Sequence, residues 1–179
     1  STNPFSMQLR ADYQELLNVT VNVGNGAFVS AVGNVLYSID VLTGKATPIT
    51  TVPATIGGIA FSGTINSVAI DQTNGLIYYC DSNAVNANRA LFAYDYINNV
   101  HIVIDSDLTN NGAGASLTVG ARGVGSGAAT FNAGTLYLGV ENVSGRDDTI
   151  YKITFTGAGR VVSTAAALVT MWSTSSCAS

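Results

Sequence analysis

Charged side chains are scarce in this chain. Asp, Glu, Lys and Arg make up 10% of the residues, where roughly 25% is typical of soluble domains. The seven basic residues are scattered singly, so the chain lacks the cluster of Lys and Arg with which proteins neutralise phosphates. We therefore expect no nucleic-acid partner. Because the net charge is only −4, identical copies would also repel one another weakly.

Long apolar runs are absent as well. No segment approaches the ~20 apolar residues that a membrane-spanning helix needs, so no membrane span is predicted. The run Ala165–Trp172 is far shorter, and we interpret it as a final buried strand or a docking tail. The polar start Ser1–Pro4 is typical of a mature, processed end. Ser, Thr, Asn and 19 glycines take the place of charge, which favours an extracellular or cell-surface β protein.

Cysteine is rare too, with only Cys80 and Cys177. In a secreted chain an intramolecular disulfide between them is our preferred interpretation, and closing so long a loop would stabilise the fold by up to ~4–5 kcal/mol in the chain-entropy model. Two alternatives stay open. Cys80 is a buried free thiol with Cys177 free near the end of the chain, or Cys177 bridges two chains. Two cysteines without histidine neighbours do not predict a metal site.

One phrase of the sequence occurs three times, which indicates a modular architecture. Its copies are Asn34–Ile49, Arg89–Ile104 and Asp148–Ser163. Each copy begins with apolar residues that alternate with period two, continues with a turn signal and ends in a second apolar run. This pattern predicts a β-hairpin. The turn signals are Thr43-Gly44, Asn98-Asn99 and Thr156–Gly159.

A second pair of related strands precedes the later two copies. Ser67–Cys80 matches Gly127–Gly139, and each contains a tight-turn signal, Asn74-Gly75 or Ala133-Gly134. Each unit is therefore predicted to have four antiparallel strands in two hairpins.

The first unit is shorter than the others. Leu17–Val23 and Ala27–Val32, around a Gly-Asn-Gly turn, are predicted to form its first hairpin. The Gly-rich segments Ile56–Gly63 and Asn110–Gly127 are expected to connect the units. Only Met7–Leu17 has apolar residues on one helical face, and an extended N-terminal arm fits that segment equally well.

The four-stranded units resemble the blades of a β-propeller. The resemblance is carried by Gly75-Leu-Ile-Tyr-Tyr79, Gly134-Thr-Leu-Tyr-Leu138, Leu36–Gly44 and Ile150-Tyr-Lys-Ile153. These motifs are similar to degenerate propeller repeats of secreted bacterial proteins, whereas the Trp-Asp and Gly-His signatures of WD40 repeats are absent. The resemblance covers residues 17–165 and implies nothing about activity, since propellers host many functions.

The resemblance implies an all-β fold of three four-stranded antiparallel blades, which form an incomplete propeller. One domain would span residues 17–169, with blades at approximately 17–52, 64–105 and 117–169. Residues 1–16 would form an N-terminal arm and residues 170–179 a C-terminal tail.

Three blades are too few, because propellers typically close with about four to eight. Unpaired sheet edges recruit other chains, so we expect completion by association or by the terminal arms. Two copies would make a six-bladed ring, or arcs would continue into a filament or sheet. Residues 1–16 and 170–179 are candidates for strand addition to a neighbour. The alternative is a compact monomeric β-sandwich or barrel.

Two aspartates share one position of the repeated phrase. Asp40 and Asp95 stand where the third copy has Thr154. We expect these carboxylates to accept hydrogen bonds from turn amides; the alternative is a ring of calcium ligands around a central channel. Asp105-Ser-Asp107 and Asp147-Asp148 do not reproduce the spacing of an EF-hand, and weak calcium binding there stays open.

Residues suited to catalysis are few. The single histidine, His101, would need a neighbouring nucleophile for a triad, and the chain has no Gly-x-Ser-x-Gly elbow. Glu15 and Glu141 are the only glutamates, which disfavours a glycosidase pair. Gly120–Gly127 lacks the helix and the Lys-Ser/Thr pair of a phosphate cradle. We expect no enzyme and no cofactor, and a His101 that lies on a strand surface or packs in the core.

Aromatic residues at strand positions are expected mainly in the core between blades, with a few at a rim that stack on sugar rings. They are Tyr37, Tyr78, Tyr79, Phe92, Tyr96, Tyr137 and Tyr151. Asn18-Val-Thr20 and Asn142-Val-Ser144 are N-glycosylation acceptors in a eukaryotic secretory protein and chance matches otherwise.

These observations favour an extracellular, self-associating structural protein, the subunit of a filament, tube or surface layer whose partners are copies of itself. The alternative is a propeller-like adhesin or glycan-binding module without catalytic activity.

Overall fold

The computed structural model describes residues 28–82, 90–109, 128–140 and 149–170. These residues contain strands and no helix. The strands are β1 (Phe28–Val32), β2 (Val35–Ile39), β3 (Ala46–Thr51), β4 (Thr55–Ile56), β5 (Ile59–Ala60), β6 (Ile65–Asp71), β7 (Leu76–Asp81), β8 (Leu91–Asp95), β9 (Val100–Asp105), β10 (Ala129–Asn132), β11 (Thr135–Val140), β12 (Thr149–Thr156) and β13 (Val161–Thr170). They form four antiparallel sheets of two to four strands, so the all-β prediction is confirmed.

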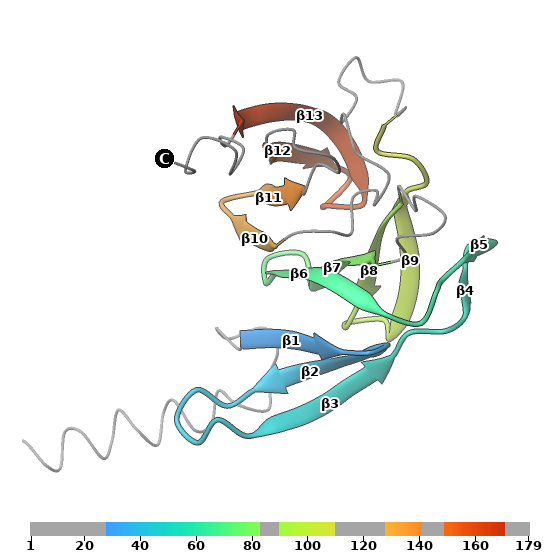
Figure 1. The fold of residues 1–179 in the computed structure, drawn as a ribbon, viewed down its shortest axis with the longest axis vertical. Helices are drawn as coiled ribbons and strands as arrows, with labels where there is room; N and C mark the ends of the chain where they lie inside the picture. The colour runs from blue at the N-terminus through green and yellow to red at the C-terminus, as the bar shows by residue number, and fades with distance from the viewer. Residues whose placement is uncertain (1–27, 83–89, 110–127, 141–148, 171–179) are drawn as a thin grey trace, which may run out of the picture.

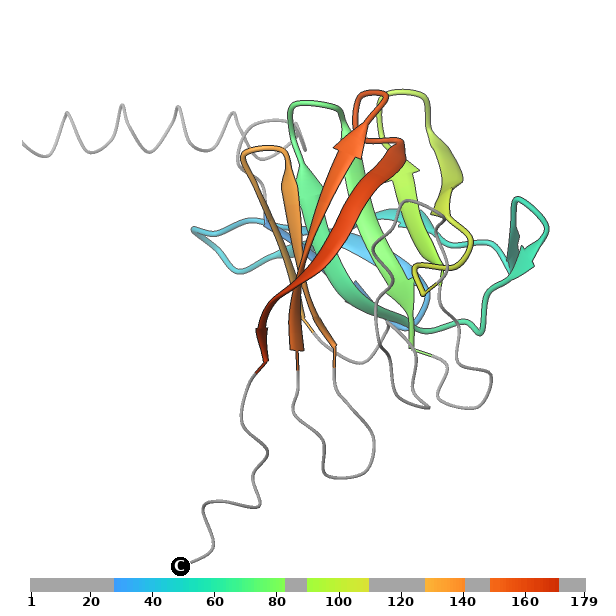
Figure 2. The same cartoon turned by 90° about the horizontal axis from the view of Figure 1, so that it is seen from above.

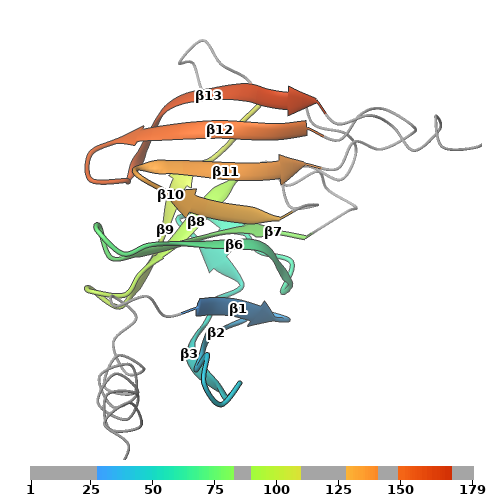
Figure 3. The ribbon, with the colours of Figure 1, turned by 90° about the vertical axis from the view of Figure 1, so that its left-hand side faces the viewer.

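Three of the sheets are simple meanders, in which each strand pairs with the next along the chain. We call them the first sheet (β1–β3), the middle sheet (β6–β9) and the last sheet (β10–β13). They lie one on another in chain order, from the blue first sheet to the orange and red last sheet (Figure 1). A perpendicular view repeats this order (Figure 3). The described residues form an open stack and no closed ring.

All three copies of the repeated phrase form hairpins, as predicted. They are β2–β3, β8–β9 and β12–β13. The second predicted pair of hairpins is also present, as β6–β7 and β10–β11. The turn between β10 and β11 is two residues long, and Ala133 and Gly134 both have positive φ angles, 46° and 79°. A type I′ turn requires this conformation because its twist matches that of the flanking strands.

The middle sheet is buried on both faces, which explains its nearly continuous apolar sequence. All residues of β7 and β8 are buried. Toward the first sheet the middle sheet presents Ile77, Tyr79, Phe92 and Tyr94. Toward the last sheet it presents Leu76, Tyr78, Cys80, Leu91 and Ala93. Side chains that alternate along a strand supply the two faces, so the first and last sheets both pack on this one.

The first sheet has three described strands where its neighbours have four. Its hairpin β2–β3 turns at Asp40, as β8–β9 turns at Asp95. Therefore β2 corresponds to β8, the third strand of the middle sheet, and β1 corresponds to the second strand, β7. The direction of the strands agrees with this assignment. β7 is antiparallel to β6, and β1 also runs opposite to β6 (Figures 1 and 3).

One hairpin was not predicted. The segment expected to connect the first two units contains the two-stranded sheet β4–β5. Its Ile56 is buried, and the following Phe61 meets Tyr79 and Phe92 edge-on, with ring centroids 6.1 Å apart in both pairs. This connector therefore caps one end of the packing between the first and middle sheets.

Several predictions lie outside the described residues. They concern the arm 1–16, the helix or extended arm at Met7–Leu17, the strand Leu17–Val23, Glu15, Glu141, Gly120–Gly127, Asp147-Asp148, Asn18, Asn142, Cys177 and the tail beyond Thr170.

Candidate functional site

The repeat-position aspartates hold turns together, as predicted. Asp40 Oδ1 accepts hydrogen bonds from the amides of Leu42 and Thr43 at 2.9 and 3.2 Å. Asp95 Oδ1 accepts bonds from the amides of Ile97 and Asn98 at 3.1 and 3.0 Å. The hydrogen bond from the Leu42 amide contributes most to lowering the pKa of Asp40.

Asp71 makes the same arrangement in the β6–β7 turn, which the sequence comparison missed. Its Oδ1 accepts bonds from the amides of Thr73 and Asn74, and its Oδ2 accepts a bond from the Asn74 side chain at 2.7 Å. The shared Asp-x-x-Asn pattern of Asp71–Asn74 and Asp95–Asn98 would have revealed it. Within the described part of the chain, no group of three or more His, Cys, Asp or Glu side chains is placed to hold a metal ion.

The β12–β13 turn of the last sheet is bonded to the middle sheet. Arg160 Nη2 lies 2.7 Å from Asp95 Oδ2, and the Tyr78 hydroxyl donates to the carbonyl oxygen of Gly159 at 2.8 Å. The turns of β6–β7, β8–β9 and β12–β13 gather at one end of the molecule (Figure 2). These polar contacts join the middle sheet to the last sheet.

His101 is packed between sheets, which is one of the two positions expected for it. Its imidazole lies on β9 with Nδ1 2.8 Å from the Tyr79 hydroxyl and Nε2 3.2 Å from Thr50 Oγ1. The ring also packs at 4.9 Å from the ring of Tyr94. Burial lowers the pKa of His101. The neutral imidazole satisfies both hydroxyl groups, so this histidine connects the first and middle sheets.

Cys80 is a buried free thiol in the structure. Burial, with the nearby negative charge of Asp81, raises the pKa of its thiol to about 12. The predicted partner Cys177 lies outside the described residues, so the disulfide stays a prediction.

Most of the singled-out aromatic residues belong to the core. Tyr78, Tyr79, Phe92 and Tyr151 are buried, and Tyr37, Tyr96 and Tyr137 are half-buried. The Tyr78 ring stacks on Phe131 and Phe155 of the last sheet, with ring centroids 5.5 and 4.9 Å apart.

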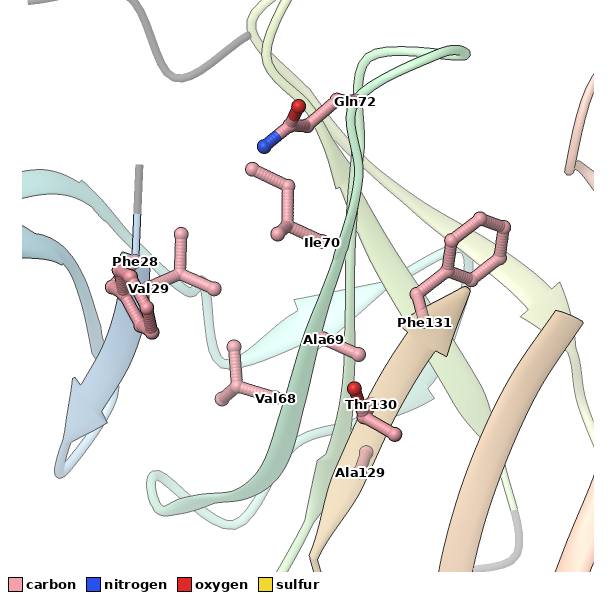
Figure 4. A pocket seen from close by; sticks show the side chains of 9 residues that line it. All are labelled: Phe28, Val29, Val68, Ala69, Ile70, Gln72, Ala129, Thr130 and Phe131. Atoms are coloured by element: carbon pink, nitrogen blue, oxygen red, sulfur yellow. The ribbon is translucent and has the colours of Figure 1, made fainter. Parts of the chain in front are cut away.

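An open groove of about 330 Å³ lies between β1, β6 and β10. Val29 of β1 and Val68 and Ile70 of β6 face one another, and the β10 residues of the lining lie on the other side of β6 (Figure 4). The lining residues are Phe28, Val29, Val68, Ala69, Ile70, Gln72, Ala129, Thr130 and Phe131, none of them charged. The groove offers apolar contact and few polar groups for the recognition of a small molecule.

The outer face of the first sheet is the second candidate surface. We define it by the cross-strand pairs Phe28–Ile39 and Ser30–Tyr37. The register assigns the first pair to the positions of Ile77–Tyr94 in the middle sheet and Leu136–Ile153 in the last. It assigns the second to the positions of Tyr79–Phe92 and Leu138–Tyr151.

These equivalent positions differ in burial. The residues of the middle and last sheets are at most 5% exposed because each packs on the preceding sheet. Phe28 is 65% exposed, and Ser30 is exposed as well. No described element covers this outer face, although its positions are those that contact a preceding sheet elsewhere in the molecule.

The outer face of the last sheet contains the Tyr137–Lys152 pair, which corresponds to Tyr78–Ala93 in the middle sheet. In the middle sheet that pair packs on the last sheet, so the last sheet presents the face on which a following sheet would pack. Lys152 is exposed and Tyr137 half-buried.

Neither a protein-family model nor a curated protein matches this chain. No helix in the described ranges is long and apolar enough to cross a membrane.

Proposed function

We propose that this protein is an extracellular structural subunit that assembles with copies of itself into a filament, tube or surface layer. The outer face of the first sheet binds the outer face of the last sheet of another copy. The proposal is supported above all by Phe28 and Ser30, which are exposed at positions that are buried in both other sheets.

Such a contact repeats the packing inside the chain. The middle sheet packs on the first sheet through the face that corresponds to the outer face of the first sheet. It packs on the last sheet through the face that corresponds to the outer face of the last sheet. Burying a fully exposed Phe contributes about 1.5–3 kcal/mol; Phe28 is 65% exposed and would contribute proportionately less, and its apolar neighbours Tyr37 and Ile39 would add to it. The Lys152 stem can lie along this surface with its ammonium group in water.

In this proposal the three large sheets are propeller-like blades. The contact is heterologous, because it joins two different faces. Two copies close a six-sheet ring when the rotation between sheets permits closure, and otherwise copies continue as a fibre.

The test is to measure the particle mass of the purified protein by light scattering over a range of concentrations and to image the particles by electron microscopy. We expect rings of two copies or extended polymers. A particle that stays monomeric at high concentration would refute the proposal. Glycan binding is the alternative function, and glycan-array binding lost on substitution of Tyr37 would favour it.

A further inference from the structure

We propose that the groove between β1, β6 and β10 is the docking site for Leu17–Val23 of the same chain, which adds to β1 as the innermost strand of the first sheet. This inference does not rest on self-association, since it concerns the unpaired edge of the first sheet, although Phe28 of the outer face also lines the groove.

The first argument is the order of strands. In the middle and last sheets, β6 and β10 precede the strands that correspond to β1. Among the described strands, no strand takes this place in the first sheet. The edge of β1 that faces away from β2 is thus unpaired in the described part of the chain, and an unpaired edge favours the addition of a strand.

The second argument is direction. β6 and β10 run the same way, and β1 runs opposite to them (Figures 1 and 3). A strand that pairs antiparallel with β1 therefore runs in the direction of β6 and β10, as the first strand of a third equivalent sheet must.

The third argument is the match between groove and segment. Val29, Val68 and Ile70 line the groove, and no lining residue is charged. Leu17–Val23 has no charged residue either, and its valines alternate with Asn and Thr. One face of such a strand is apolar and suits the groove, while the other is polar.

The last argument is reach. Only Gly24–Ala27 separates this segment from β1. Four residues span at most about 14 Å, and the two glycines suit a tight hairpin turn. The segment can therefore pair with β1 of its own chain far more readily than with a distant copy.

The test is hydrogen exchange on the full-length protein and on Val21→Pro, because proline removes a strand amide. We expect the β1 amides that do not bond to β2 to be protected in the wild type and to exchange at least tenfold faster in Val21→Pro. The matched control, Gln8→Pro, should leave them protected, and β7 amides report that the fold is intact.

Two results with the wild type would overturn the inference. One is a wild type in which those β1 amides exchange as freely as exposed amides. The other is protection that falls on dilution, which would assign the occupant to another copy. If Val21→Pro unfolds the chain, Val21→Asp replaces it, since it keeps the amide but places a charge against the apolar groove. Unchanged protection in that variant would also count against the inference.

Discussion

The Arg160 guanidinium of the last sheet lies 2.7 Å from the Asp95 carboxylate of the middle sheet. The Asp95 side chain is 2% exposed and the Arg160 side chain is 37% exposed. The carboxylate therefore has little contact with water and relies on protein groups for its hydrogen bonds, whereas the guanidinium can also bond to water. Burial raises the pKa of Asp95, but hydrogen bonds from Asn98 and Arg160 outweigh this effect and leave the pKa below its usual value.

We predict that Arg160→Gln lowers the free energy of unfolding by about 1 kcal/mol, because a half-exposed ion pair contributes little more than that while Asp95 keeps its bonds to the turn. Urea denaturation measures the loss. Lys152→Gln on the same sheet has no described ion-pair partner and serves as control, with an expected change below about 0.5 kcal/mol. Equal losses in the two variants would show that the Arg160–Asp95 pair is not the cause.

The environment of His101 predicts how the free energy of unfolding depends on pH. Its folded pKa is lowered by burial, so the unfolded chain binds the proton more readily. The contribution to stability is complete above the unfolded pKa of about 6.5 and is lost as the pH falls through this value toward the folded pKa. Denaturation between about pH 7.5 and 5 should show this loss. His101→Gln, which cannot titrate, should lack this part of the pH dependence; an identical profile in the variant would contradict the assignment.

Gly159 is predicted to tolerate no side chain. Its φ is +81°, and a Cβ at this position would collide with the Tyr78 hydroxyl, which donates to the Gly159 carbonyl. Gly159→Ala should destabilise the fold by about 2–3 kcal/mol through backbone strain and displacement of Tyr78. Gly134→Ala is the matched control, because its φ is +79° and no atom lies near the added Cβ. Thermal unfolding should show the larger loss for Gly159→Ala, and equal losses would exclude the collision.

Cys80 is predicted to be unreactive in the native protein. Its thiol is buried, and its raised pKa leaves almost no thiolate at neutral pH. In Cys177→Ser, a thiol reagent should modify Cys80 only at the rate of global unfolding. Fast modification would contradict the packing around Cys80. For the wild type, labelling after denaturation without reductant tests the predicted disulfide, which would leave no thiol to react.

The hairpins could be predicted because their signals are local. Alternating apolar residues and turn pairs such as Ala133-Gly134 identify β10–β11 without knowledge of the rest of the chain. The turn bonds of Asp40 and Asp95 follow from the same local pattern.

Contacts between sheets could not be read in this way. Nothing near Arg160 in sequence indicates Asp95, and nothing near His101 indicates Thr50, because packing of whole sheets brings these residues together. The exposed outer face of the first sheet also depends on the three-dimensional order of sheets. Only after register equates Phe28–Ile39 with Ile77–Tyr94 does the exposure of Phe28 become informative.

The central claim is that two different faces of the chain bind each other, and a mixing experiment tests it most directly. Tyr37→Glu damages the outer face of the first sheet, and Tyr137→Glu places the same change on the last sheet. In sedimentation velocity we predict that each variant alone is monomeric and that their mixture forms dimers, because one intact pair of faces remains. Association of Tyr137→Glu alone would indicate contact between two first sheets, and unchanged association of both variants would contradict the account altogether.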